Sequence, residues 1–120
     1  MTTLEHENIK DLTEKLLDLI AKTSVEIGHK TDAQTMATLS KIFADDLQNE
    51  NRFKNLTFNQ IQDAFHQGVR FGKDEPFLNI RTFYKWVYSH KKTIDNAIYL
   101  TEKLQQKNIK YYQPKQKLIK

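Results

Sequence analysis

The chain has 120 residues, of which 38% are hydrophobic and 28% charged, and this predicts one domain with a single core. It contains no cysteine, which excludes disulfide bonds and thiolate metal sites and favours an intracellular location. The apolar runs are only a few residues long, and the N-terminal residues lack a signal-peptide pattern. We therefore expect a cytoplasmic protein that is not associated with a membrane.

The net charge of +4 is divided unevenly along the sequence. Residues 1–50 carry ten acidic and five basic side chains, a net charge of −5, whereas residues 51–120 carry five acidic and fourteen basic side chains, a net charge of +9. Two interpretations follow from this division. Either the two halves pack together and neutralise each other, or the basic half faces a polyanion or an anionic groove on a nucleoprotein.

Two amphipathic helices are predicted in the acidic half. Over residues 4–23, apolar residues recur every three or four positions, and Gly28 marks the end of this helix or of a short extension. Thr31 and Gln34 have the spacing of a capping box, in which each side chain binds the other residue's backbone N–H group. A second helix is therefore predicted to begin there and to end near Leu47.

Two further helices are predicted in the middle of the chain. Thr57 and Gln60 repeat the capping-box spacing, and this third helix is expected to end near Gly72, because glycine tolerates the positive φ of many helix exits. Asn79 is a favourable N-cap residue for a fourth helix. Trp86 lies on the apolar stripe of that helix, so we predict that it is buried in the core.

The C-terminal part either continues the helix that begins at Asn79 or forms a separate helix capped at Thr93. A separate or kinked helix is favoured, because residues 89–93 contain no strong helix former. Residues 109–120 contain no acidic residue, and Pro114 predicts the end of any helix. They are expected to form a flexible basic tail, which either only improves solubility or becomes ordered on a partner.

The predicted fold is all-α, a single compact bundle of four to five helices over residues 1–108 followed by the basic tail. No catalytic signature accompanies it. The four histidines are isolated in sequence, and although His66 follows Asp63 by three positions, no motif supplies a nucleophile beside it. The adjacent carboxylates of Asp45 and Asp46 diverge on a helix, so they predict no metal site. We expect a non-enzymatic protein with no cofactor and no small-molecule substrate.

Basic and aromatic residues alternate on the fourth predicted helix. Tyr84 and Tyr88 are interleaved with Arg81 and Lys85, a combination that can stack bases while its cations bind phosphates, or that can anchor a protein partner. The predicted contacts are Arg70, Lys73, Arg81, Tyr84, Lys85, Tyr88, Lys91 and Lys92, with further contacts in the tail from Lys110, Tyr111, Tyr112, Lys115 and Lys117.

The segments AFHQGVR (Ala64–Arg70) and LNIRTFYKWV (Leu78–Val87), joined by a loop, resemble small helical proteins encoded by phages and prophages of Bacteroidetes-type bacteria, often associated with replication. The resemblance covers about residues 55–92. It implies a mobile-element protein that binds RNA or DNA, or a nucleic-acid-bound protein complex, in a bacterial host cell. Small phage proteins also include anti-CRISPR inhibitors that dock on the effector protein or its guide RNA, and this is the alternative expectation.

Overall fold

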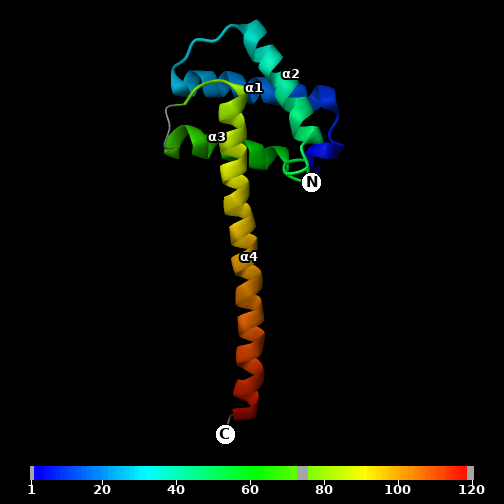
Figure 1. Cartoon of the computed structure of the whole chain (residues 1–120), viewed down its shortest axis with the longest axis vertical. Coiled ribbons are helices and arrows are strands. Elements are labelled where there is room, and N and C mark those ends of the chain that lie inside the picture. The colour runs from blue at the N-terminus through cyan, green and yellow to red at the C-terminus, as the bar shows by residue number, and fades with distance from the viewer. Residues whose placement is uncertain (1, 73–75, 119–120) are drawn as a thin grey trace.

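The computed structural model describes residues 2–72 and 76–118, and it describes the surroundings of side chains as far as residue 105. A short 3-10 helix, η1 (Leu4–His6), precedes four α-helices: α1 (Ile9–Ile27), α2 (Ala33–Asn49), α3 (Phe58–Phe71) and α4 (Ile80–Leu118). The prediction of an all-α bundle is therefore confirmed (Figure 1).

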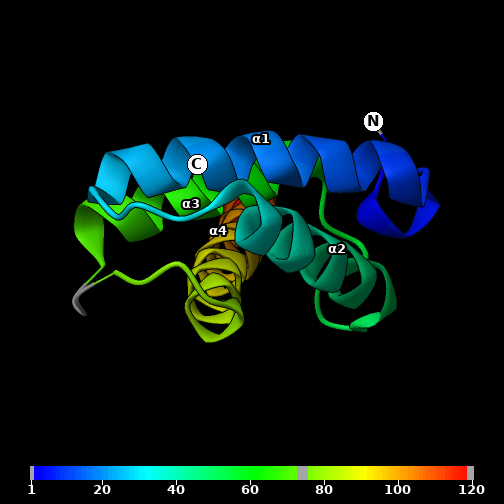
Figure 2. The same cartoon turned by 90° about the horizontal axis from the view of Figure 1, so that it is seen from above.

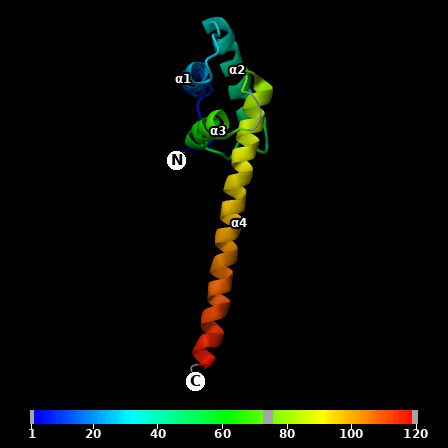
Figure 3. The same ribbon diagram turned by 90° about the vertical axis from the view of Figure 1, so that its left-hand side faces the viewer.

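Helices α1, α2 and α3 and the first turns of α4 form a body, from which the rest of α4 projects (Figure 1). In the body, α1 contacts both α2 and α3, and α3 contacts the first turns of α4. Figures 1 and 3 show α4 running transverse to α1 and α3 and continuing far beyond them. Seen from above, α4 is viewed along its axis while α1 extends across the whole body (Figure 2). This projection gives the molecule principal extents of 72 × 31 × 18 Å.

Helix α1 begins later than its apolar pattern predicted. Asn8 is its N-cap, and its side-chain oxygen accepts hydrogen bonds from the backbone N–H groups of Lys10 and Asp11 at 2.9 and 3.3 Å. The predicted start near Leu4 is wrong because the backbone N–H of Leu4 binds the carbonyl of Leu56, at 2.8 Å, and so fixes η1 to the connector before α3. The predicted end is confirmed, since Gly28 caps the helix with a φ of +73°.

The N-terminus of α2 is capped by a different residue from the one predicted. The carboxylate of Asp32 accepts hydrogen bonds from the Thr35 hydroxyl at 2.6 Å and from its backbone N–H at 3.1 Å. These hydrogen bonds lower the pKa of Asp32. The capping box proposed for Thr31 and Gln34 is therefore wrong, because the neighbouring carboxylate takes the cap position, where a negative charge also interacts favourably with the helix dipole.

The caps predicted for α3 and α4 are confirmed. Thr57 and Gln60 form the reciprocal capping box, with a hydrogen bond of 2.9 Å from the Thr57 N–H to the Gln60 side chain and one of 3.3 Å in the opposite direction. The side-chain oxygen of Asn79 accepts a hydrogen bond of 2.8 Å from the backbone N–H of Thr82. Local sequence therefore sets the start of both helices that pack against each other.

The end of α3 lies at Gly72 as predicted, but for a different reason. Its φ of −64° is open to any residue, so positive φ is not what the position requires. A Cβ at Gly72 would lie 2.5 Å from the carbonyl oxygen of Gly68, and a Cβ at Gly68 would lie 2.2 Å from the ring of Trp86. The absence of a side chain at Gly68 therefore allows α3 to pack directly on the indole ring.

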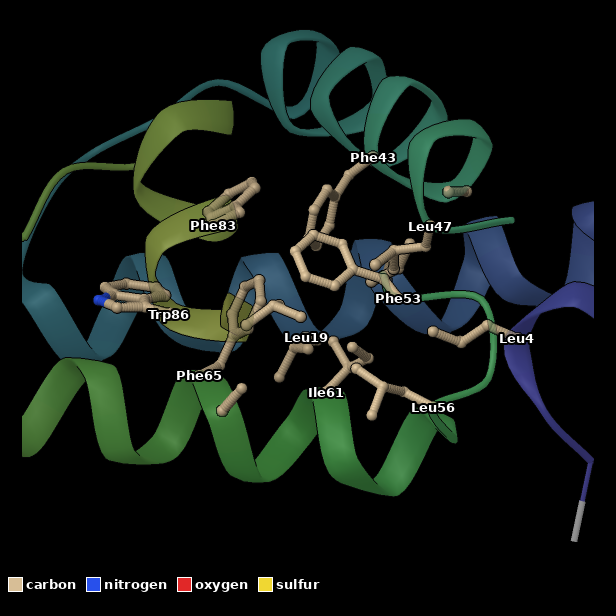
Figure 4. Close-up of a cluster of buried hydrophobic side chains, with 14 of the residues drawn as sticks. Leu4, Leu19, Phe43, Leu47, Phe53, Leu56, Ile61, Phe65, Phe83 and Trp86 are labelled. Carbon is tan, nitrogen blue, oxygen red and sulfur yellow. The ribbon is translucent and has the colours of Figure 1, made fainter. Parts of the chain in front are cut away.

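Aromatic rings from three helices meet in the centre of the body (Figure 4). The ring of Phe65 from α3 lies 5.0 Å from that of Phe83 and 5.2 Å from that of Trp86, both on α4, and Phe43 from α2 lies 5.3 Å from Phe83. Trp86 is only 8% exposed, which confirms its predicted place in the core. This cluster fixes the first turns of α4 against α2 and α3.

Beyond the core, α4 continues as one helix through Leu118. The predicted break near Thr93 is wrong because the Thr93 hydroxyl donates to the Ser89 carbonyl at 3.2 Å, so it bonds within the helix instead of capping a new one. The helix end expected at Pro114 is also wrong. A proline removes one hydrogen bond of the helix, and the turns on either side can keep theirs.

Candidate functional site

Two of the predicted contact residues are occupied by ion pairs. The Arg70 guanidinium lies 2.6 Å from the Glu26 carboxylate and so links α3 to α1. This hydrogen bond lowers the pKa of Glu26. Lys91 lies 2.6 Å from Asp95, one turn further along α4. Both cations were predicted to bind a ligand; each one has a carboxylate partner in the fold, with which a ligand would have to compete.

Tyr84 also differs from its predicted role, because its ring packs on the core. Its ring centroid lies 5.9 Å from that of Phe43 and 5.6 Å from that of Phe53. Burial, together with a hydrogen bond from its hydroxyl to Asp46, raises the pKa of Tyr84 to about 12. The side chain therefore connects α4 to α2 and is not available for stacking on a base.

Tyr88, one turn further, is the exposed aromatic residue that the prediction required. It is 44% exposed, and two cations approach its ring: the Arg52 guanidinium at 5.6 Å and the Lys92 amine at 5.9 Å. Distances of this size are typical of cation–π contacts. Arg52 also lies over Phe53 at 5.3 Å, and its Nε atom donates to the Glu50 carboxylate at 3.0 Å.

Arg52 was not among the predicted contacts. It belongs to the turn between α2 and α3, and it is 36 positions away from Tyr88 in the sequence (88 − 52). The hydrogen bond from Arg52 lowers the pKa of Glu50, and the same bond raises the pKa of the guanidinium. The carboxylate thus orients Arg52 and offsets part of its charge. No local motif indicates this arrangement, because the fold alone brings the turn to α4.

Basic and aromatic side chains continue from Tyr88 along α4 in a stripe. We call this set the α4 stripe; its members, all of them exposed, are Arg81, Lys85, Tyr88, Lys92, Tyr99 and Lys103. An α-helix turns about 100° per residue, so the positions of this set fall within an arc of about 60° around the helix axis.

The stripe contains a second pair of the same kind as Tyr88 and Lys92. The Lys103 amine lies 5.8 Å from the centroid of the Tyr99 ring, and Tyr99 is 60% exposed. Neither residue was among the predicted contacts. The signal that could have found them is the spacing, because a lysine follows both Tyr88 and Tyr99 by four positions, and the two tyrosines are 11 positions apart (99 − 88).

Outside the stripe, α4 also carries exposed apolar residues. Ile98, Leu100 and Leu104 are all more than half exposed there. Nearer the body, Ile94, which lies on the same face of the helix as Ile98, is partly buried against the core. Apolar residues of α4 therefore continue from the body along its projecting part.

Some predicted contacts lie outside what the structure describes. Lys73 is not among the described residues, and α4 is described by its backbone alone at the remaining positions, which are Lys110, Tyr111, Tyr112, Lys115 and Lys117. These contacts stay predictions.

A groove between α1 and α3, of about 560 Å³, contains the pair considered for acid–base chemistry, Asp63 and His66. Its described lining includes no serine, threonine or cysteine beside them. In the described part of the chain, no three histidine or carboxylate side chains are grouped to hold a metal ion. Nor does any described helix have the length and apolarity needed to cross a membrane.

Comparisons with protein-family models, curated proteins and solved structures found no match to this chain. The function of this chain therefore has to be inferred from the chemistry of its surface. The most distinctive surface in the described residues is the α4 stripe together with Arg52, where exposed tyrosine rings lie beside cations.

Proposed function

We propose that the protein is a non-enzymatic accessory protein, of the kind that phages encode, which binds nucleic acid or a nucleic-acid-bound protein complex in the bacterial cytoplasm. The α4 stripe and Arg52 form the contact surface in this proposal. The observation that carries it is the exposed ring of Tyr88, approached by both Arg52 and Lys92.

The two kinds of side chain in the stripe match the two parts of a nucleotide. Cations bind phosphate oxygens without regard to sequence, and an exposed aromatic ring offers a face on which a base can stack. Contact between the cations and the rings also orients the long side chains before a ligand arrives, which reduces the entropy lost on binding. The excess of positive charge in residues 51–120 would attract a polyanion to this surface.

The first test is a double variant, Arg52→Ala with Lys92→Ala, measured by fluorescence anisotropy with a labelled oligonucleotide. Removing two phosphate contacts should weaken binding and lower the slope of log Kd against log salt by about two. A matched control is Lys22→Ala with Lys41→Ala, which removes the same charge from exposed positions on α1 and α2.

The comparison between these two variants decides the proposal. Equal affinities and equal salt slopes for the variant and the control would show that only the overall charge matters, and would contradict a role for this surface. A circular dichroism spectrum and a melting curve should be unchanged in both variants, because exposed substitutions usually alter stability by less than about 0.5 kcal/mol.

A second candidate function is that of an inhibitor or adaptor that docks on a protein, such as the effector of a host defence system. The exposed apolar residues Ile98, Leu100 and Leu104 favour this candidate. Salt separates the two functions, since binding through phosphates weakens steeply as ionic strength rises and an apolar interface is much less sensitive. Binding that survives high salt and is lost in Leu100→Ala with Leu104→Ala would favour the second candidate.

A further inference from the structure

The α4 stripe contains two units of the same construction, Tyr88 with Lys92 and Tyr99 with Lys103. In each unit the lysine amine lies just under 6 Å from the centre of the ring, at 5.9 and 5.8 Å. Eleven residues of α-helix make slightly more than three full turns, so the two rings lie within about 20° of each other around the axis. They are separated by about 16 Å along it.

We propose that these two units bind one single strand of nucleic acid laid along α4, with a base stacked on each tyrosine and the backbone phosphates beside the lysines. This inference rests on the proposed function and specifies its ligand. Tyr88 and Tyr99 are 44% and 60% exposed, so each ring has a surface that a base can reach.

A single strand fits the stripe better than a duplex because of what each of them exposes. Bases in a duplex are stacked on one another, so their faces cannot reach a tyrosine, whereas the bases of a single strand can be splayed apart and stacked on aromatic rings. Against a duplex, the stripe would use only its cations.

The flank of the stripe also disfavours a duplex. A helix that enters the major groove has phosphates on both sides, and cations on both flanks would be needed to hold it. On α4, Asp95 and Glu102 lie along one edge of the stripe, at about 20–80° and 40–100°, respectively, from its members around the helix. Although Asp95 is paired with Lys91, Glu102 is exposed. A narrow single strand can follow the stripe and avoid these carboxylates.

The distance between the units predicts the length of strand that they bind. Stacked bases rise by about 3.4 Å each, so 16 Å corresponds to about five steps. A strand of about six nucleotides can therefore reach both tyrosines, whereas two nucleotides, which span a single step, can reach only one. Affinity should rise sharply between these two lengths.

The experiment measures anisotropy of labelled oligo(dT) and oligo(rU) of 2, 6 and 12 nucleotides, and of a 12-base-pair DNA duplex, with the full chain. We expect the 12-nucleotide strands to bind at least tenfold more tightly than the duplex. Tyr88→Leu and Tyr99→Leu should each weaken single-strand binding roughly tenfold, the size expected for one stacked base. The control is Phe71→Leu, which replaces an aromatic residue that is 72% exposed at the end of α3.

The outcomes separate this inference from the proposed function. One outcome is that duplex and single strand bind with equal affinity, that neither tyrosine variant changes this affinity, and that Arg52→Ala with Lys92→Ala weakens binding. In that case the protein binds nucleic acid but the single-strand inference is overturned. If Tyr88→Leu weakens binding and Tyr99→Leu does not, the two-unit arrangement is overturned. If neither single strand nor duplex binds, both proposals fail.

Discussion

The body of the protein and the projecting part of α4 use the same residue types in different ways. In the body, Arg70 is paired with Glu26, and the ring of Tyr84 is packed on phenylalanines. Along the projecting part, Lys103 lies beside the exposed ring of Tyr99. Cations and aromatic rings therefore stabilise the fold in one region and form a candidate binding surface in the other, and three-dimensional surroundings decide between these roles.

The largest expected effect that tests this comparison is on stability. Trp86→Ala removes a buried indole and should lower the free energy of unfolding by about 3–5 kcal/mol. Leu104→Ala on the projecting part should change it by less than about 0.5 kcal/mol, because Leu104 is 59% exposed. Urea unfolding monitored by circular dichroism measures both. A loss for Leu104→Ala comparable to that for Trp86→Ala would mean that the projecting part is itself packed in a core.

A smaller effect concerns the hydroxyl of Tyr84. Tyr84→Phe removes its hydrogen bond to Asp46 and should cost about 1 kcal/mol at neutral pH. The pKa of this tyrosine is about 12 in the fold and near 10 in the unfolded chain. Because the folded pKa is the higher one, the contribution is complete below about pH 10 and is lost as the pH rises toward 12.

Urea unfolding from pH 8 to pH 11.5 measures this pH dependence. The difference in stability between the wild type and Tyr84→Phe should shrink over the upper part of this range. Tyr99→Phe is the matched control, because Tyr99 is a 60% exposed tyrosine on the projecting part of the same helix. A wild type and a Tyr84→Phe variant with parallel pH profiles would contradict the assignment of Tyr84 to the body.

The smallest effect is expected for the ion pair between α1 and α3. Glu26→Gln should lower the free energy of unfolding by less than about 1 kcal/mol, because the pair is partly exposed to solvent. Since Arg70 lowers the pKa of Glu26, this contribution is present above the unfolded pKa and is lost as the pH falls through the folded value.

The control for this pair is Glu14→Gln, an exposed position on the same helix. Thermal melts at pH 7 and pH 3 should show a larger difference between wild type and Glu26→Gln at pH 7 than at pH 3. If the two glutamine variants behave alike at both pH values, Arg70 is not held by Glu26 in solution and returns to the set of candidate ligand contacts.

Local chemistry explains which parts of the fold could be predicted. The caps at Thr57 and Asn79 each depend on a residue three positions away, and Trp86 lies on a regular apolar stripe, so the sequence contains the necessary information. At the start of α2, two adjacent residues could each serve as the cap, and pattern alone did not favour Asp32 over Thr31. The choice between two adjacent cap residues depends on the hydrogen bonds that each one makes in the fold, here those of Asp32 to Thr35, which residue spacing alone does not give.

The candidate site was predicted only in part for a different reason. Tyr88 and Lys92 lie on one helix face and could be selected from their spacing. The contact between Tyr88 and Arg52 joins the helix to a distant turn, and the bond between Tyr84 and Asp46 joins two helices. Such pairs depend on how the helices pack, so a surface residue and a packed residue on the same helix could not be distinguished beforehand.

One consequence follows from the continuity of α4 between the core and its projecting part. A helix resists twisting about its axis. The direction in which Tyr99 points around the axis of α4 is therefore set by how Phe83 and Trp86 pack among the rings of the body. A single residue inserted between Lys92 and Tyr99 would leave the body unchanged and would rotate every later residue of α4 by about 100° around the helix axis. The core thus acts as the angular reference for both tyrosines, which remain aligned only while the helix between them keeps its length.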